Sequence, residues 1–540
     1  MPVPMRDGID LSANVFLPGT GGRLPAILVR TAYGKGSELR PGYRAFVDHG
    51  YAVVVQDVRG RHKSEGEFDP LRQEVADGND TLYWIAHQPW SNQRVGMMGA
   101  SYLGIVQWKA ALSSSPYLKA IFPAVAGCDE YFDRFYSPGG ALKLGHRLEW
   151  ISENLRLPEF KPEFPRFIRH LPLRTSDQAA TGRTIDFFQQ ALDHPAYDAF
   201  WKSLSTREQI GRVRVPVFSA GGWYDNFLES DLEAFRLLRD RGRVSRIVIG
   251  PWAHNFSYQF PGVDFGPAAR TGLRELQFEW FDYWLKNPDA GRDASGVTNP
   301  PVRIFVMGAN RWRDEREWPL RRAVPTPFFL AGRGRANTLG GHGRLDSHAP
   351  RRAAPDQFVY DPRDPVPTAG GSVCCNPKLL PWGPLDQRAV EQRRDVLVYT
   401  GPPLKRPVEV TGPVRVMLYV STSAPDTDFT AKLVDVFPDG LARNLTDGML
   451  RLRYRDSIER PAPVTPGSVY AITIDAGVTS NEFERGHRIR LEVSSSNFPR
   501  YDRNPNTGRR IADEKELRPA TQRVYRDRRR PSQVLLPVVP

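Results

Sequence analysis

The sequence lacks the features that would place it among secreted, membrane or metal-binding proteins. Its 540 residues include 3 cysteines, too few for a disulfide framework. No apolar run reaches the roughly 20 residues of a membrane span. Residues 1–20 lack the charged start and apolar core of a signal peptide, so we expect a cytoplasmic protein. Zinc spacings, a Walker A loop and G-x-G-x-x-G are also missing, and we expect no metal and no cofactor.

Two further scarcities concern paired cysteines and clustered charge. Cys374 and Cys375 are neighbours. A disulfide between them is one alternative, but because a bond between adjacent cysteines is sterically awkward, we expect two reduced thiols. The net charge of +13 would allow binding to nucleic acid or to a membrane surface. The 74 basic residues are, however, interleaved with 61 acidic ones along the chain. We therefore expect a solvated surface and neither nucleic acid nor membrane as a partner.

What the sequence does contain is alternating strand and helix patterns in its first part. A chain of this length needs about two to four domains. Short apolar runs alternate with helical stretches in residues 1–127, and this alternation predicts a parallel, doubly wound α/β sheet. The predicted strands are Leu24–Arg30, Tyr51–Asp57, Val95–Met98 and Ala120–Val125, and the helices are Arg44–His49, Val75–His87 and Ser101–Ser113.

The rest of the chain divides into three further segments. Residues 128–206 show helical spacing at Ala141–Leu155 and Ile185–Leu192, which predicts an all-helical cap inserted between two strands. Alternation resumes in residues 207–317, which we predict to form the second part of the α/β domain. Residues 318–540 carry short strands punctuated by Pro, Gly and Asp, typical of a β-sandwich. Its predicted strands are Val396–Tyr399, Val414–Val420, Thr430–Val436, Val469–Ile474 and Arg488–Val493.

The stretch Val95–Gly104 is typical of a nucleophile elbow. An apolar run ends at Gly99, a small residue follows, and Ser101 precedes a helical pattern. In such a turn the serine hydroxyl is exposed at the carboxyl edge of the sheet, and small neighbours leave room for the strained backbone. The pattern departs from G-x-S-x-G because the second glycine is Gly104 and position 103 is Leu.

A serine nucleophile needs an imidazole base and a carboxylate that holds the base. In α/β-hydrolases these groups follow the serine in the order acid, then His, after later strands. Asp225 follows the apolar run that begins at Val213, and His254 follows the run that begins at Ser245. We therefore predict Ser101, Asp225 and His254 as the catalytic triad.

Other histidines and acids fit these roles less well. Three histidines precede the serine and three lie in the predicted cap, where none follows a strand of the sheet; they are His49, His62, His87, His146, His170 and His194. The rival acids precede the cap; they are Asp129, Glu130 and Asp133.

Motifs along almost the whole chain resemble the cocaine esterase / X-Pro dipeptidyl-peptidase (CocE/NonD) family of α/β-hydrolase serine hydrolases. They appear in family order at Met5–Gly8, Arg30–Tyr33, Asp57–Gly60, Ser64–Gly66, Gly99–Gly104, Gly221–Asp225, Gly250–His254 and Ser495–Arg500. The resemblance accounts for Gly104 and implies that the C-terminal β-sandwich is a jelly roll of the galactose-binding-like type.

Two donors are expected to bind the oxyanion of the tetrahedral intermediate. The elbow itself presents the backbone N–H of Tyr102, the residue after the nucleophile. The second donor is implied by the resemblance, which places a tyrosine hydroxyl at the position of Tyr33.

The substrate is less well defined by sequence. Relatives that hydrolyse α-amino acid esters carry acids just after the catalytic Asp, whereas Asn226–Leu228 follow Asp225 here. The resemblance suggests Phe227, together with Trp223 and Trp150, as an apolar acyl pocket, although all three residues equally suit a core. A neutral apolar acyl group fits such a lining.

These observations predict a serine carboxylic-ester hydrolase that forms an acyl-enzyme from a small-molecule ester or amide. X-Pro dipeptidyl-peptidase activity is an alternative, and one of the acids Asp129, Glu130 or Asp133 would then bind the free amine. Amide cleavage or acyl transfer by the same triad is a second alternative. A catalytically idle carbohydrate-binding protein is a third, because jelly rolls bind glycans. The β domain could also support a homodimer.

Overall fold

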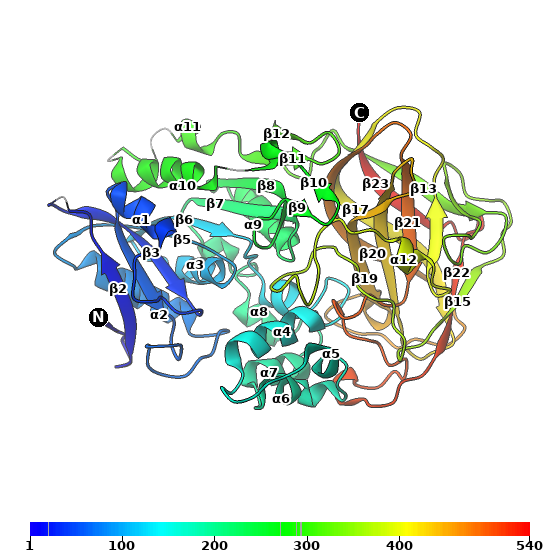
Figure 1. Ribbon diagram of the computed structural model, residues 1–540, viewed down its shortest axis with the longest axis horizontal. Helices are drawn as coiled ribbons and strands as arrows, with labels where there is room; N and C mark the ends of the chain where they lie inside the picture. The colour runs from blue at the N-terminus through cyan, green and yellow to red at the C-terminus, as the bar shows by residue number, and fades with distance from the viewer. Residues whose placement is uncertain (20, 271, 288, 292–293) are drawn as a thin grey trace.

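The computed structural model describes residues 1–19, 21–270, 272–287, 289–291 and 294–540. Two β-rich parts lie side by side, with a group of helices beneath their junction (Figure 1). The first part contains a 10-stranded sheet in the order β1-β2-β4-β3-β5-β6-β7-β8-β11-β12. Its strands are β1 (Pro2–Pro4), β2 (Asp10–Phe16), β3 (Leu24–Thr31), β4 (Ala52–Asp57), β5 (Ser91–Ala100), β6 (Leu118–Ala124), β7 (Val217–Tyr224), β8 (Ser245–Ala253), β11 (Val302–Val306) and β12 (Arg311–Glu315).

The centre of this sheet is parallel and its edges are antiparallel. In the order of the sheet, adjacent strands in the stretch β4-β3-β5-β6-β7-β8-β11 pair with one another in parallel. The predicted parallel sheet is therefore confirmed for the centre. At the edges, β1 with β2, β2 with β4, and β11 with β12 pair antiparallel. The β11–β12 connection spans only residues 307–310, and a connection this short can join only antiparallel strands.

Helices cover both faces of the sheet, as a doubly wound fold requires. One face packs against α1 (Pro41–Asp48) and α10 (Leu273–Phe281). The other packs against α2 (Glu74–Ala86) and α3 (Tyr102–Leu112). Figure 1 shows α1 and α10 above the strands and α2 and α3 below them.

The chain between β6 and β7 forms a helical insertion. A π-helix at Glu130–Phe135 comes first. The α-helices that follow are α4 (Leu144–Leu155), α5 (Phe164–Phe167), α6 (Ser176–Thr181), α7 (Asp186–Asp193) and α8 (Ala199–Leu204). Helix α4 begins three residues later than predicted, because Leu142 is instead paired with Tyr136 in an antiparallel bridge, with a turn between the two residues.

The C-terminal part is built from β-strands and contains only short helical turns, such as α12 (Arg388–Glu391). Its sheet has the order β15-β22-β17-β23-β13-β14-β16-β21-β18-β19, and β20 pairs with β17 outside this path. The strands are β13 (Val324–Gly332), β14 (Gly343–Asp346), β15 (Asp356–Tyr360), β16 (Leu397–Thr400), β17 (Val408–Thr422), β18 (Asp428–Val436), β19 (Ala442–Arg451), β20 (Tyr470–Phe483), β21 (Arg488–Ser494), β22 (Ala520–Tyr525) and β23 (Gln533–Val539). The all-β character predicted for this part is confirmed.

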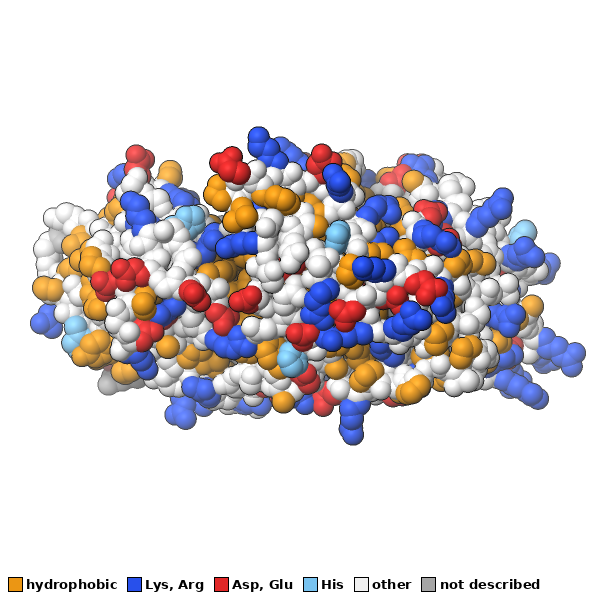
Figure 2. Space-filling model, turned by 90° about the horizontal axis from the view of Figure 1, so that it is seen from below, with side chains coloured by type: hydrophobic (Ala, Val, Ile, Leu, Met, Phe, Trp, Pro, Cys, Tyr) orange, Lys and Arg blue, Asp and Glu red, His pale blue; other side chains and the backbone are white. Residues whose placement is uncertain are grey.

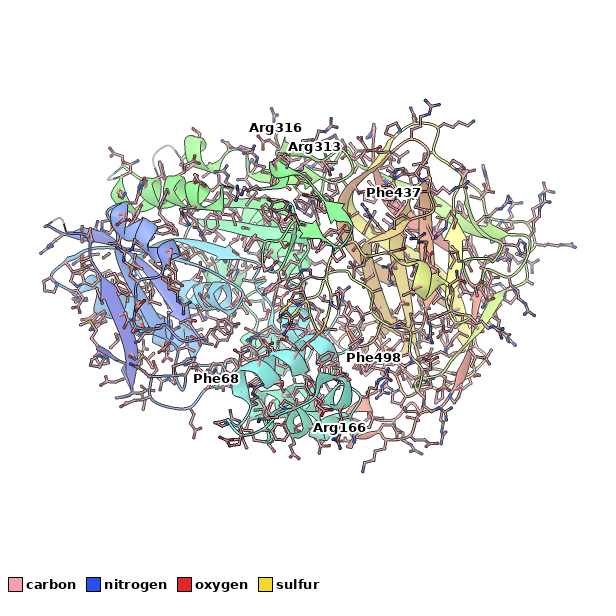
Figure 3. All side chains as sticks on the ribbon, in the orientation of Figure 1. Phe68, Arg166, Arg313, Arg316, Phe437 and Phe498 are labelled. Atoms are coloured by element: carbon pink, nitrogen blue, oxygen red, sulfur yellow. A yellow bond between two sulfur atoms is a disulfide. The ribbon has the colours of Figure 1, made fainter. Side chains whose placement is uncertain are left out.

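The two β-rich parts share one apolar core. Trp223 and Phe305 of the first sheet belong to the same buried cluster as Ile474 and Phe483 of β20. Phe498, labelled in Figure 3, lies where the β part meets the helical insertion, and the Arg169 guanidinium is 5.3 Å from its ring. The four predicted domain segments, 1–127, 128–206, 207–317 and 318–540, stay a proposal.

The surface and the cysteines complete the description. No helix within the described residues is long and apolar enough to cross a membrane. On the lower face, acidic and basic side chains are interspersed (Figure 2).

The expectation of two reduced thiols is wrong for this structure, in which Cys374 and Cys375 form a disulfide. A left-handed backbone at Cys375, with φ 91°, turns the chain between the two residues.

Candidate active site

Ser101 lies at the turn between β5 and α3 in a strained conformation. Its φ is 59° and its ψ is −127°, a combination that costs energy for any residue with a side chain. The turn is held because the Ser101 N–H donates to the Ala124 carbonyl oxygen at 2.9 Å and the Ser101 carbonyl accepts from Gly104 at 2.8 Å. The strain and its supports are those of a nucleophile elbow.

The glycines around the serine are required by close packing. A Cβ on Gly104 would lie 2.5 Å from the Cβ of Ala126, and a Cβ on Gly99 would lie 2.5 Å from the Cβ of Leu103. The first turn of α3 therefore approaches the chain after β6 closely at position 104. This contact explains why the second glycine comes at position 104 when position 103 is Leu.

The predicted acid and base are joined by a short hydrogen bond. His254 Nδ1 lies 2.6 Å from Asp225 Oδ1, with the Asp225 side chain fully buried and that of His254 12% exposed. The other oxygen, Oδ2, accepts from the Phe227 N–H at 2.9 Å, which fixes the carboxylate. Asp225 follows β7, His254 follows β8 and Ser101 follows β5, so all three lie beyond the carboxyl ends of parallel strands.

Tyr33 and Tyr102 lie together next to the serine. The Tyr102 side chain is buried and donates from its hydroxyl to Glu74 Oε1 at 2.7 Å. Its backbone N–H belongs to the first turn of α3, where N–H groups have no partner within the helix. The Tyr33 hydroxyl accepts from Trp150 Nε1 at 3.1 Å and lies close enough to the Ser101 side chain for that side chain to lower its pKa. Burial of this hydroxyl raises the pKa of Tyr33, whereas the hydrogen bond from Trp150 and the Ser101 side chain lower it.

Two buried arginines near Tyr33 were missed by sequence reasoning. Arg147 donates from Nε and from one terminal nitrogen to the Arg134 carbonyl oxygen, at 3.3 and 3.0 Å. Among the residues that the structure describes, Arg147 has no ion pair with a carboxylate. Burial lowers the pKa of Arg147 to about 9. Both cations lower the pKa of the Tyr33 phenol, so the field at this hydroxyl favours negative charge. Sequence offered no signal, because neither arginine lies in a recognisable motif.

The three predicted pocket residues occupy different places. The Trp150 ring is stacked with that of Tyr102 at 6.3 Å between centroids. The Phe227 ring lies 5.5 Å from that of His254. Trp223 is instead 1% exposed, and its indole donates to the Phe305 carbonyl oxygen at 2.7 Å. The structure thus puts Trp223 in the core, which was the packing alternative for this residue.

The three rival acids are already bonded to protein groups. Glu130 forms ion pairs with Arg134 and, at 2.9 Å, with Lys109. Asp129 accepts from the hydroxyl groups of Tyr197 and Ser205 and from a backbone N–H, at 2.9, 2.6 and 3.0 Å. Asp133 accepts from the Asp129 N–H at 2.6 Å, and burial holds its pKa well above the usual range.

The fold and this site define a class: an α/β-hydrolase with a serine on its nucleophile elbow. Residues 7–255 match the protein family described as X-Pro dipeptidyl-peptidase (S15 family). Residues 295–535 match the family described as X-Pro dipeptidyl-peptidase C-terminal non-catalytic domain. Cocaine esterase from a Rhodococcus species is 42% identical over 99% of this chain and 97% of that protein. The chain therefore belongs to the cocaine esterase / X-Pro dipeptidyl-peptidase family and is a serine hydrolase.

Solved structures agree with this assignment. An α-amino acid ester hydrolase is similar with a TM-score of 0.86 and 28% identity, covering 100% of this chain and 96% of its own. An aminopeptidase from a Thaumarchaeota archaeon is similar with a TM-score of 0.88 and 26% identity, covering 100% and 95% of the two chains.

Proposed function

We propose that this protein hydrolyses carboxylic esters of small acyl groups through an acyl-enzyme. The observation that carries the proposal is the buried Asp225–His254 hydrogen bond of 2.6 Å, set beyond the same sheet edge as the strained Ser101. A protein similar over its full length is named a cocaine esterase, and esters are the substrates that this name implies.

In the proposed mechanism, Ser101 Oγ attacks the ester carbonyl and His254 accepts the serine proton. Asp225 holds Nδ1–H of the imidazole and stabilises the imidazolium that forms. The bond to the leaving alcohol then breaks, and His254 returns the proton to that alcohol. Water attacks the acyl-enzyme in the same way, with His254 as base, and this step releases the carboxylic acid and restores Ser101.

The oxyanion of each tetrahedral intermediate is proposed to accept from the Tyr102 N–H and from the Tyr33 hydroxyl. Donors that are already in place stabilise charge in a transition state without the cost of reorganisation. The Trp150 indole fixes the position of the Tyr33 oxygen. Arg134 and Arg147 add a positive field at that oxygen, which favours the developing negative charge.

The buried acids favour the ester over an X-Pro dipeptide. A peptidase of that kind needs a carboxylate free to bind the α-amino group of its substrate. Glu130 is instead paired with two cations, and Asp129 accepts three hydrogen bonds. The Phe227 ring lies 5.5 Å from that of His254, and Trp150 contacts the Tyr33 hydroxyl; aromatic rings beside the base and the proposed oxyanion donor suit a neutral apolar acyl group. Amide cleavage by the same residues is the second candidate, because its first chemical step is the same.

Hydrolysis of three chromogenic substrates tests the proposal: a short acyl ester, a benzoyl ester and an X-Pro anilide. We expect ester turnover that Ser101→Ala abolishes, while the exposed Ser203→Ala variant, our matched control, keeps it. Preference for the anilide would overturn the ester assignment in favour of the peptidase. Equal turnover by Ser101→Ala and wild type would overturn the triad, and no turnover at all would favour the carbohydrate-binding alternative.

Two further proposals concern the location of the protein in the cell and its oligomeric state. We propose a cytoplasmic location, which cell fractionation tests. We also propose a homodimer formed through the β domain, which sedimentation at several concentrations tests.

A further inference from the structure

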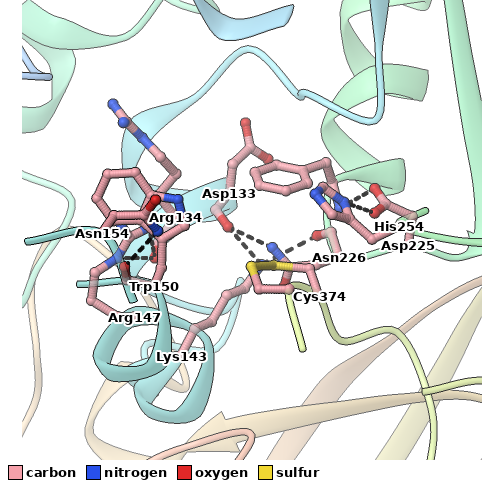
Figure 4. Close-up of a disulfide and its surroundings, with 12 residues drawn as sticks. Asp133, Arg134, Lys143, Arg147, Trp150, Asn154, Asp225, Asn226, His254 and Cys374 are labelled. Atoms are coloured by element: carbon pink, nitrogen blue, oxygen red, sulfur yellow. Dashed lines mark hydrogen bonds and ion pairs between the residues drawn. A yellow bond between two sulfur atoms is a disulfide. The ribbon is translucent and has the colours of Figure 1, made fainter. Parts of the chain in front are cut away.

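The disulfide Cys374–Cys375 lies in a loop of the β part that packs against helix α4. Asn376, the next residue, donates to Glu153 Oε1 of this helix at 2.7 Å. Nearby, the Gly145 N–H donates to the Pro499 carbonyl oxygen at 2.8 Å. Figure 4 shows the disulfide among side chains from the helical insertion and from the loops that carry Asp225 and His254. The two sulfurs therefore lie at the junction of all three parts.

His146 on α4 completes a compact group of ligand atoms. One of its ring nitrogens and the two cysteine sulfurs all lie within 4.8 Å of one another. His146 is 5% exposed, and among the described residues its Nδ1 has no hydrogen-bond partner. A buried polar atom without a partner costs about 1–3 kcal/mol, so such an atom points to a ligand.

We propose that, once the disulfide is reduced, Cys374, Cys375 and His146 bind a thiophilic divalent cation such as Zn²⁺. Thiolate and imidazole are the ligands that Zn²⁺ prefers, at about 2.3 Å for sulfur and about 2.0–2.1 Å for nitrogen. Ligand atoms of a tetrahedral site are then about 3.5–3.8 Å apart. The three ligand atoms lie within 4.8 Å of one another. To reach the spacing of a tetrahedral site, the two sulfurs, which are bonded in the disulfide, must separate once reduced, and water takes the fourth position.

The oxidation state of Cys374 and Cys375 decides whether the cation site can form. A dithiol reductant supplies two electrons and two protons: its own sulfurs become joined, the Cys374–Cys375 bond breaks, and each cysteine sulfur becomes a thiol. Binding of the cation then releases both thiol protons to solvent, because the thiolate is the ligand. In the disulfide both sulfurs are used by the covalent bond, so the oxidised protein has no such site.

The cation would lie close to the proposed catalytic base. The ring of His146 packs edge-on against that of Phe227, 5.9 Å between centroids, and Phe227 lies 5.5 Å from His254. Loading the site would therefore fix one wall of the acyl pocket. Binding itself does not depend on the proposed function, so a failure of either proposal can be recognised separately.

The test is Zn²⁺ binding to the full chain, measured by competition with a coloured chelator. Two samples of wild-type protein are compared. One is oxidised, and the other has been reduced with a dithiol that is then removed in the absence of oxygen. We expect about one Zn²⁺ per reduced chain and none per oxidised chain. Co²⁺ in place of Zn²⁺ should give the intense near-ultraviolet absorption of cobalt–thiolate bonds. Equal binding by the two forms, or failure of the dithiol to expose both thiols to alkylation, would overturn the proposal.

Variants identify the ligands. Cys374→Ser with Cys375→Ser should abolish binding, and His146→Ala should weaken it by about tenfold or more. The matched controls are the remaining cysteine and an exposed histidine: Cys128→Ser and His87→Ala should bind as wild type does. An unchanged affinity in His146→Ala, or loss of binding in Cys128→Ser, would refute the assignment. If the double serine variant fails to fold, the comparison of oxidised and reduced wild type still decides.

Discussion

Replacing Tyr33 by Phe tests the oxyanion assignment more directly than removal of the serine does. The change deletes one hydroxyl and keeps the ring, which packs against Tyr102 and Trp150 with both centroid distances 6.4 Å. Although the Tyr33 hydroxyl is enclosed by its neighbours, the residue as a whole is 38% exposed, so we expect little change in stability. Loss of one oxyanion donor costs about 3–4 kcal/mol, or roughly 10²–10³-fold in kcat. KM should change little, because the hydroxyl is proposed to act on the intermediate.

The assay is steady-state hydrolysis of a nitrophenyl ester, with kcat and KM measured separately. Tyr83→Phe serves as the matched control, since Tyr83 is 58% exposed and lies on α2, outside the site. A Tyr33→Phe variant that keeps kcat within about threefold of wild type would refute the role of this hydroxyl, given the cost that such donors carry. An increase in KM alone would assign Tyr33 to substrate binding.

Three further predictions follow from single contacts. Asp225→Asn should lower kcat by about 10⁴-fold because the imidazole loses its carboxylate; a loss below tenfold in ester hydrolysis would contradict the triad. Gly104→Ala should cost about 1–3 kcal/mol of unfolding free energy in a denaturant titration, because the new Cβ lies 2.5 Å from the Cβ of Ala126. Gly42→Ala should cost less, because a Cβ there meets no other described part of the chain within 4 Å. Burial raises the pKa of Glu149 from 4.5 to about 9, so the folded protein keeps a proton there that the unfolded chain loses, and stability falls as pH rises across this window. Thermal unfolding at several pH values should show a shallower fall for Glu149→Gln; an equal slope would refute the shift.

Much of the sheet and the candidate triad were predictable because they depend on local sequence. The strands of the parallel centre are short apolar runs that end at small or polar residues, and each predicted catalytic residue follows such a run. The chain order Ser101, Asp225, His254 then places all three at one sheet edge, because parallel strands share the edge at which they end.

Several strands of the β part were not predictable for an equally local reason. β13 contains Pro325 and Pro327, and proline removes a donor that a strand needs. In the structure Pro325 lies opposite Pro537 of β23, so two residues without an N–H face each other. The prediction began β17 at Val414, after Pro413. In the structure the strand begins earlier, at Val408, and runs through Pro413, because a β-bulge follows this residue.

The groups that tune the site depend on contacts between distant segments, which no local pattern reports. The Trp150 indole reaches Tyr33 across 117 residues, and His146 meets the two cysteines of a loop more than 200 residues later in the chain. Gly104 shows the same limit within a motif. Its small size is required by Ala126, a residue of the next segment, so the spacing of the second glycine is set by where α3 touches that segment. A departure from a motif is therefore informative when the missing side chain has a partner elsewhere in the fold.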